Sequence, residues 1–149
     1  MHLLAERDAD AVRSHLAALA CPVRLEYFTE GSSGIVVPGR ECRSCGDTER
    51  LLEDLAACST FVTLHVHDRF RDPGVFTAFG IDKVPGLALV GAEDYGIRYY
   101  GMPAGYELRN ILDVILDVGR GAADLAAETR EGLAGLSADV HLQVLVTPT

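Results

Sequence analysis

The chain has 149 residues, 48% of them hydrophobic, and carries a formal net charge of −9. That length and apolar content predict one globular domain with a buried core and exclude a disordered chain. The negative charge argues against nucleic acid and anionic membranes as main partners, and no apolar run reaches the length of a membrane span.

Hydrophobic periodicity and turn residues predict helices and strands that alternate along the chain. In chain order, the expected elements are a helix over 5–20, a strand over 23–28, a helix that follows CRSC (42–45), a strand over 61–67, a short helix over 71–80 closed by Gly80, strands over 86–91 and 96–101 joined as a hairpin, and a helix over 104–119. Residues 29–41, rich in glycine and serine, are expected to form a loop. This order predicts an α/β domain over residues 1–120, with a mixed sheet flanked by helices.

Residues 121–149 are expected to form a helix-strand extension, with a helix over 122–135 and a strand over 139–146. The extension repeats the start of the chain at a constant offset, because Leu16, Leu19, Val23 and Leu25 map onto Leu133, Leu136, Val140 and Leu142. This pattern indicates the start of a second similar unit, although any helix followed by a strand gives a similar pattern. An unpaired apolar strand recruits partners. We therefore expect 139–146 to pair with the domain's own sheet or with the same strand of a second chain, as a homodimer.

The chain has four cysteines, Cys21, Cys42, Cys45 and Cys58. The N-terminus lacks the basic start and long apolar stretch of a secretory signal, so we expect a cytoplasmic protein. In a reducing cytosol, two cysteines close in sequence are more often catalytic or metal-binding than structural. Cys21 and Cys58 are expected to pack as small hydrophobic residues.

Cys42 and Cys45 stand three residues apart at the start of a predicted helix, where they can close a small disulfide. The free amides and dipole of a helix start favour a thiolate on Cys42, and Arg43 adds a positive charge, whereas Glu41 and Asp47 oppose it. Cys42 would be the exposed nucleophile, and Cys45, one turn further in, would resolve a mixed disulfide.

A zinc site is the competing interpretation of this motif, because CRSCG also resembles a zinc knuckle. A closed site needs four ligands, and the sequence has no second CxxC. His65 and His67 share one face of a predicted strand and could complete a site, although such histidines are more often exposed strand residues.

Two further residues are candidates for the site. Pro85 stands where a strand is expected to begin, so Val84–Pro85 is either a cis bond or an ordinary turn. Glu26 lies in an apolar strand. It is either a buried carboxylate that exchanges protons with Cys45, or an exposed residue paired with Arg24 or another arginine.

These features together resemble the two-unit protein disulfide oxidoreductases, also called glutaredoxin-like proteins, of archaea and thermophilic bacteria, within the thioredoxin superfamily. The points of match are PVRLEYF (22–28), a CxxC that opens a helix, IDKVPG (81–86), GIRYYGMPAGYE (96–107) and DVHLQVLVTPT (139–149). The resemblance spans almost the whole chain. It implies a thioredoxin-like N-terminal unit followed by the truncated start of a second unit.

The resemblance also implies roles for individual residues. Cys42 would be the attacking thiol, Cys45 the resolving thiol, Pro85 the cis-proline that faces the disulfide, and Glu26 the buried carboxylate of the strand before the motif. The family exchanges disulfides in proteins and can be recycled by a thioredoxin reductase.

We therefore expect a thiol-disulfide oxidoreductase that reduces or exchanges disulfides in cytosolic proteins through Cys42 and Cys45. Neither a cofactor nor a metal ion is expected. Two alternatives stay open: a redox-inactive binding or scaffold domain of thioredoxin fold, and a small zinc-binding domain.

Overall fold

The computed structural model describes residues 3–31 and 41–146. Their elements are, in chain order, α1 (Glu6–Leu16), β1 (Val23–Thr29), α2 (Cys45–Ala56), β2 (Val62–Asp68), α3 (Pro73–Phe79), β3 (Gly86–Val90), β4 (Arg98–Tyr100), α4 (Tyr106–Arg120) and α5 (Ala127–Ala134). The predicted order of helices and strands is confirmed as far as α4. Most of the predicted loop falls on residues 32–40, which lie outside the described residues.

The sheet has four strands in the order β2-β1-β3-β4. β1 runs parallel to β2 and antiparallel to β3, and β3 is antiparallel to β4. The predicted hairpin and mixed sheet are therefore confirmed. Because β1 and β2 are parallel and β3 begins opposite Phe28, the end of β1, the end of β2 and the start of β3 lie at the same end of the sheet.

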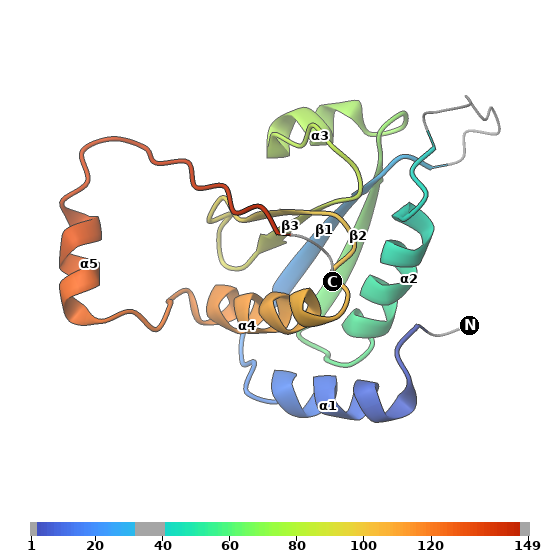
Figure 1. The fold of residues 1–149 in the computed structure, drawn as a ribbon, viewed down its shortest axis with the longest axis horizontal. Helices are drawn as coiled ribbons and strands as arrows, with labels where there is room; N and C mark the ends of the chain where they lie inside the picture. The colour runs from blue at the N-terminus through green and yellow to red at the C-terminus, as the bar shows by residue number, and fades with distance from the viewer. Residues whose placement is uncertain (1–2, 32–40, 147–149) are drawn as a thin grey trace.

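Helices cover both faces of the sheet, with α1, α2 and α4 on one face and α3 on the other (Figure 1). Successive side chains of β1 alternate between these faces, as in any strand. Leu25 and Tyr27 belong to the large core shared with α1, α2 and α4, whereas Phe28 belongs to the smaller core against α3. Whether a β1 residue has an odd or an even number therefore decides which of the two cores its side chain enters.

Glycine ends two of the helices that frame the sheet. Gly80 follows α3 with φ of 65°, as predicted, and Gly121 follows α4 with φ of 64°. Both angles lie in the left-handed region, which glycine adopts without the strain that a side chain would add. None of the helices in the described ranges is long and apolar enough to cross a bilayer.

The extension after α4 differs from the prediction. α5 forms within the expected helix, but it buries no residue and stands apart from the sheet (Figure 1). Residues 139–146 form no strand, so the predicted strand and its pairing with the domain's own sheet are wrong. The four residues that echo the buried start of the chain are 50 to 87% exposed, and these are Leu133, Leu136, Val140 and Leu142.

The physical reason is that β propensity reflects packing on a pleated, half-buried surface more than an intrinsic preference of the backbone. Residues 139–146 pair with no strand and pack on no apolar face in the described chain. Pairing of this segment with a second chain stays a prediction, as does its interpretation as the start of a second unit.

Candidate active site

The two cysteines of the CxxC motif form a disulfide, with an S–S distance of 2.03 Å and a Cα–Cα distance of 5.4 Å. Cys45 is the first residue of α2 and is only 4% exposed, whereas Cys42 precedes the helix and is partly exposed. A thiol from another molecule can therefore approach Cys42 more easily than Cys45. The expected pair and its asymmetry are both present.

The other two cysteines are free thiols. Cys58 is partly buried, and burial raises the pKa of its thiol. Cys21 is exposed, so its predicted packing in the core is wrong.

The Val84–Pro85 peptide bond is cis, as expected. Pro85 is buried, immediately precedes β3, and accepts a hydrogen bond of 2.9 Å from the Gly101 amide through its carbonyl oxygen. Since β3 starts at the sheet end where β1 finishes, Pro85 lies at the end from which the chain leaves β1 toward Cys42.

Tyr27 is the strand residue that reaches the motif. Its fully buried side chain donates a hydrogen bond of 2.8 Å from the hydroxyl to the backbone oxygen of Cys45. Burial is the main cause that raises the pKa of Tyr27 to about 12, so the hydroxyl stays protonated at neutral pH. The buried Thr48 hydroxyl donates a bond of 2.7 Å to the Ser44 backbone oxygen. Two buried hydroxyls thus hold the first turn of α2.

Glu26 lies on the other face of β1. It is 5% exposed, and its carboxylate contacts Arg24 Nε at 3.1 Å, His65 Nδ1 at 3.4 Å and His67 Nε2 at 2.7 Å. Both open interpretations therefore hold in part, since Glu26 is buried and also paired with Arg24. Its partners in the described chain do not include Cys45. The expected proton exchange with Cys45 gains no contact from the structure and stays a prediction.

Tyr27 was not among the predicted site residues, because the hydrophobic pattern locates the strand without showing which of its residues face α2. A useful signal was available: Leu25 is strongly apolar and must face a core, so Tyr27, two residues later, faces the same core.

The histidines considered as zinc ligands also lie on the Glu26 face. His65 pairs with Glu26 in the strand register, and His67 pairs with Phe28 of the smaller core. They are therefore on the opposite side of the sheet from Tyr27 and the start of α2. Among the described residues, no group of three or more His, Cys, Asp or Glu side chains is arranged to hold a metal ion.

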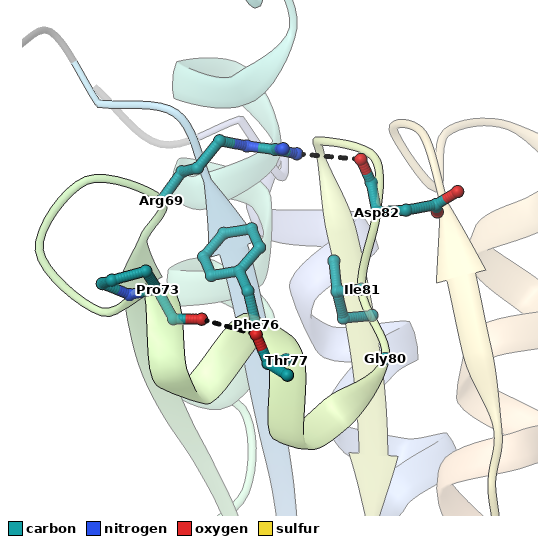
Figure 2. Close-up of a pocket in the computed structure, with 7 residues that line it drawn as sticks. All are labelled: Arg69, Pro73, Phe76, Thr77, Gly80, Ile81 and Asp82. Atoms are coloured by element: carbon teal, nitrogen blue, oxygen red, sulfur yellow. Dashed lines mark hydrogen bonds between the residues drawn. The ribbon is translucent and has the colours of Figure 1, made fainter.

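A cavity of about 520 Å³ lies between α3 and the segment that leads to Pro85 (Figure 2). The Arg69 guanidinium donates a hydrogen bond of 3.1 Å to the Asp82 backbone oxygen and lies 5.1 Å from the centre of the Phe76 ring. The Arg69 amide donates to the Thr29 carbonyl at 2.9 Å. Arg69 thus connects the end of β1, α3 and the segment before Pro85.

Comparison with known proteins finds no matching family model and no matching curated sequence. Among solved structures, the chain is similar to a protein disulfide oxidoreductase from Aeropyrum pernix K1, with a TM-score of 0.77 and 27% identity over 91% of this chain and 57% of that chain. The chain thus spans less than two thirds of that protein's length.

The fold is also similar to N-terminal domains of the alkylhydroperoxide reductase AhpF from Enterococcus faecalis, with a TM-score of 0.73 and 21% identity over 87% of this chain and 59% of that chain. At that identity the likeness concerns the fold alone. This chain itself contains a four-stranded mixed sheet, a disulfide at the start of α2 and a cis bond before β3. The chain therefore belongs to the thioredoxin superfamily.

Proposed function

We propose that the chain is a thiol-disulfide oxidoreductase that reduces or exchanges disulfides in cytosolic proteins. The observation that carries the proposal is the Cys42–Cys45 disulfide, in which one sulfur belongs to a partly exposed residue and the other to a buried one. The likeness to a protein disulfide oxidoreductase supports it.

In the proposed reaction, the Cys42 thiolate attacks a disulfide of the substrate protein. A bond forms between the two sulfurs, and the first substrate sulfur leaves as a thiolate that takes a proton from solvent. Cys45 then loses its proton and attacks Cys42 Sγ, which closes the intramolecular disulfide and releases the second substrate thiolate. Two electrons pass from the cysteine pair to the substrate, and the reverse sequence oxidises a substrate dithiol.

Pro85 is proposed to face this disulfide, as the family resemblance implies. Its cis bond, its burial and its place at the sheet end where β1 finishes support that role. A thioredoxin reductase is the proposed source of electrons for renewing the dithiol. The free thiols of Cys21 and Cys58 are consistent with a reducing compartment, and we place the protein in the cytosol.

Insulin reduction driven by dithiothreitol tests the proposal. The Cys42→Ser variant should lose the activity, while Cys45→Ser should accumulate a mixed disulfide with substrate that intact-mass spectrometry detects. Cys21→Ser is the matched control and should retain activity, because Cys21 lies outside the pair. Full activity of Cys42→Ser would contradict the proposal, and an inactive parent protein would favour a redox-inactive binding domain.

A further inference from the structure

The resolving step needs a group that accepts the Cys45 proton, because the thiolate and not the thiol attacks a disulfide. Tyr27 cannot serve at neutral pH, since its hydroxyl donates to a backbone oxygen and stays protonated. Glu26 contacts other side chains on the opposite face of the sheet. Because Cys45 is the first residue of α2 and contacts Tyr27 on that face of the sheet, a base that reaches its thiol is expected on the α2 side of β1.

Glu49 occupies that side. It follows Cys45 by four residues on α2, so the two side chains are neighbours on one helical stripe. The other members of the stripe, Thr48 and Leu52, are at most 1% exposed, and Glu49 itself is partly buried. An acidic residue in such a place loses hydration and needs a physical reason to be there.

The surroundings of Glu49 leave its carboxylate unpaired. In the described part of the chain it has no ion pair and no hydrogen bond with another side chain. Its charge is one of the causes that raise the pKa of Tyr27, whose hydroxyl contacts the Cys45 backbone oxygen. Glu49 is therefore close enough to act on Tyr27 electrostatically, and Tyr27 in turn contacts Cys45 at the start of α2.

We propose that Glu49 is the general base that accepts the proton from the Cys45 thiol, directly or through one water molecule, when Cys45 resolves the mixed disulfide. The inference rests on the proposed function. In this step the S–H bond of Cys45 breaks, a Cys42–Cys45 bond forms, and the bond from Cys42 to the substrate sulfur breaks. The substrate leaves as a thiolate, and Glu49 returns its proton to solvent or to that thiolate.

The charges around Glu49 favour this role. Burial is the main cause that raises the pKa of Glu49, and the nearby charge of Glu53 on the same helix is the second cause. Both bring the pKa of the carboxyl closer to neutral pH. A general base is most effective when its pKa lies near the working pH. From β1 the only titratable group on this side is Tyr27, and β2 contributes Leu64 and Val66, which do not titrate.

The remaining neighbour of α2 is α1, which contacts the far end of the helix. There Cys58 Sγ lies 3.8 Å from the Ala9 backbone oxygen, and the charges that act on Cys58 are those of Arg13, Asp54 and Asp10. Cys58 is nine residues from Glu49 and Asp54 is five residues from it. The raised pKa of Glu49 has burial and the charge of Glu53 as its causes, so these groups do not control its titration.

The test separates the two chemical steps in a background with Cys21→Ser and Cys58→Ser, so that only the pair reacts. Reduced protein is mixed with an aromatic disulfide that releases a coloured thiol. One equivalent appears when Cys42 attacks, and a second appears when Cys45 resolves. Stopped-flow absorbance records both phases across a range of pH.

In the Glu49→Gln variant we expect the first phase to keep its rate and the second to slow by about tenfold or more near neutral pH, since general base catalysis contributes ~10²–10⁴-fold. The difference should shrink at alkaline pH, where the thiol ionises without help, above a usual pKa of about 8.5. Glu53→Gln is the matched control, because Glu53 lies one turn further along α2 and is exposed. It should slow the second phase far less than Glu49→Gln does, because it removes only the secondary cause of the raised Glu49 pKa and leaves the carboxylate of Glu49 in place.

A second phase that is equally fast with and without Glu49 at every pH would overturn the inference while the proposed function stands. Equal slowing by Glu53→Gln would also overturn it, because a general loss of negative charge would then explain the effect. If the parent protein lacks the first phase, the proposed function fails and the inference fails with it.

Discussion

Replacing Tyr27 by phenylalanine removes one oxygen from the buried side chain that contacts the CxxC motif. The ring still fills its place in the core, so the main loss is the 2.8 Å hydrogen bond to the Cys45 backbone oxygen. That oxygen is in the first turn of α2 and keeps its helical partner four residues later. The expected cost is therefore that of one buried hydrogen bond, about 1 kcal/mol, and not the larger cost of an orphaned carbonyl.

Urea denaturation of the oxidised protein, followed by circular dichroism, measures this cost. With a slope of about 1–3 kcal/mol per molar urea, the midpoint should fall by roughly 0.3–1 M in Tyr27→Phe. Tyr106→Phe is the matched control, because Tyr106 is 83% exposed and its hydroxyl lies in solvent. A midpoint unchanged in Tyr27→Phe, or lowered equally in Tyr106→Phe, would refute the structural role of the Tyr27 hydroxyl.

The pH dependence adds an independent check. The pKa of Tyr27 is raised from 10.0 to about 12 in the folded protein, so the unfolded chain releases this proton first. The parent protein should therefore lose stability as the pH rises from about 10 toward 12, and a phenylalanine has no such proton to lose. The gap in stability between the parent and Tyr27→Phe should narrow over that interval.

Three other variants test separate features of the fold. Gly46→Ala should raise the free energy of unfolding by about 0.5–1 kcal/mol in thermal denaturation, because Gly46 is inside α2 and a Cβ there meets no atom within 4 Å; a loss of stability would contradict this. The parent protein should lose stability as the pH rises above 4.5, the ordinary pKa of the Glu49 carboxyl, because that pKa is raised in the folded protein. Glu49→Gln has no such proton to lose, so its urea midpoint should rise relative to that of the parent protein from acid to neutral pH. Truncation after Ala138 should convert a dimer into a monomer in light scattering with little change in melting temperature, because the removed residues 139–146 are exposed and largely apolar; a monomeric full-length chain would count against the dimer.

Local signals explain why much of this fold is predictable from the sequence. Hydrophobic spacing identified each helix and strand up to α4, because every one of them has an apolar stripe or face that meets a core. Spacing of three between Cys42 and Cys45 is itself a geometric condition for a small disulfide. Pro85 is likewise informative by itself, because a proline at the start of a strand predicts either a cis bond or a turn.

Two features depended on distant parts of the chain and were not predictable in the same way. The segment over 139–146 has the composition of a strand, but a strand also needs a neighbouring ladder, and that neighbour is missing from the described fold. The second feature is which side chains of β1 face α2 and which face α3. A strand has period two, so an error of one residue moves a side chain to the other side of the sheet.

That one-residue distinction separates two chemical environments on β1. On the α3 face, Glu26 has a cationic partner in Arg24 and a hydrogen bond with His67, so its charge is held away from the disulfide. On the α2 face, Tyr27 offers a neutral donor that fixes the position of Cys45 and exchanges no proton at neutral pH. In our proposal the strand beneath the motif therefore fixes the position of Cys45, and α2 itself supplies the group that accepts the proton. Glu49 is the acidic residue on the buried stripe of that helix, one turn from Cys45, and this is why the resolving step should depend on it.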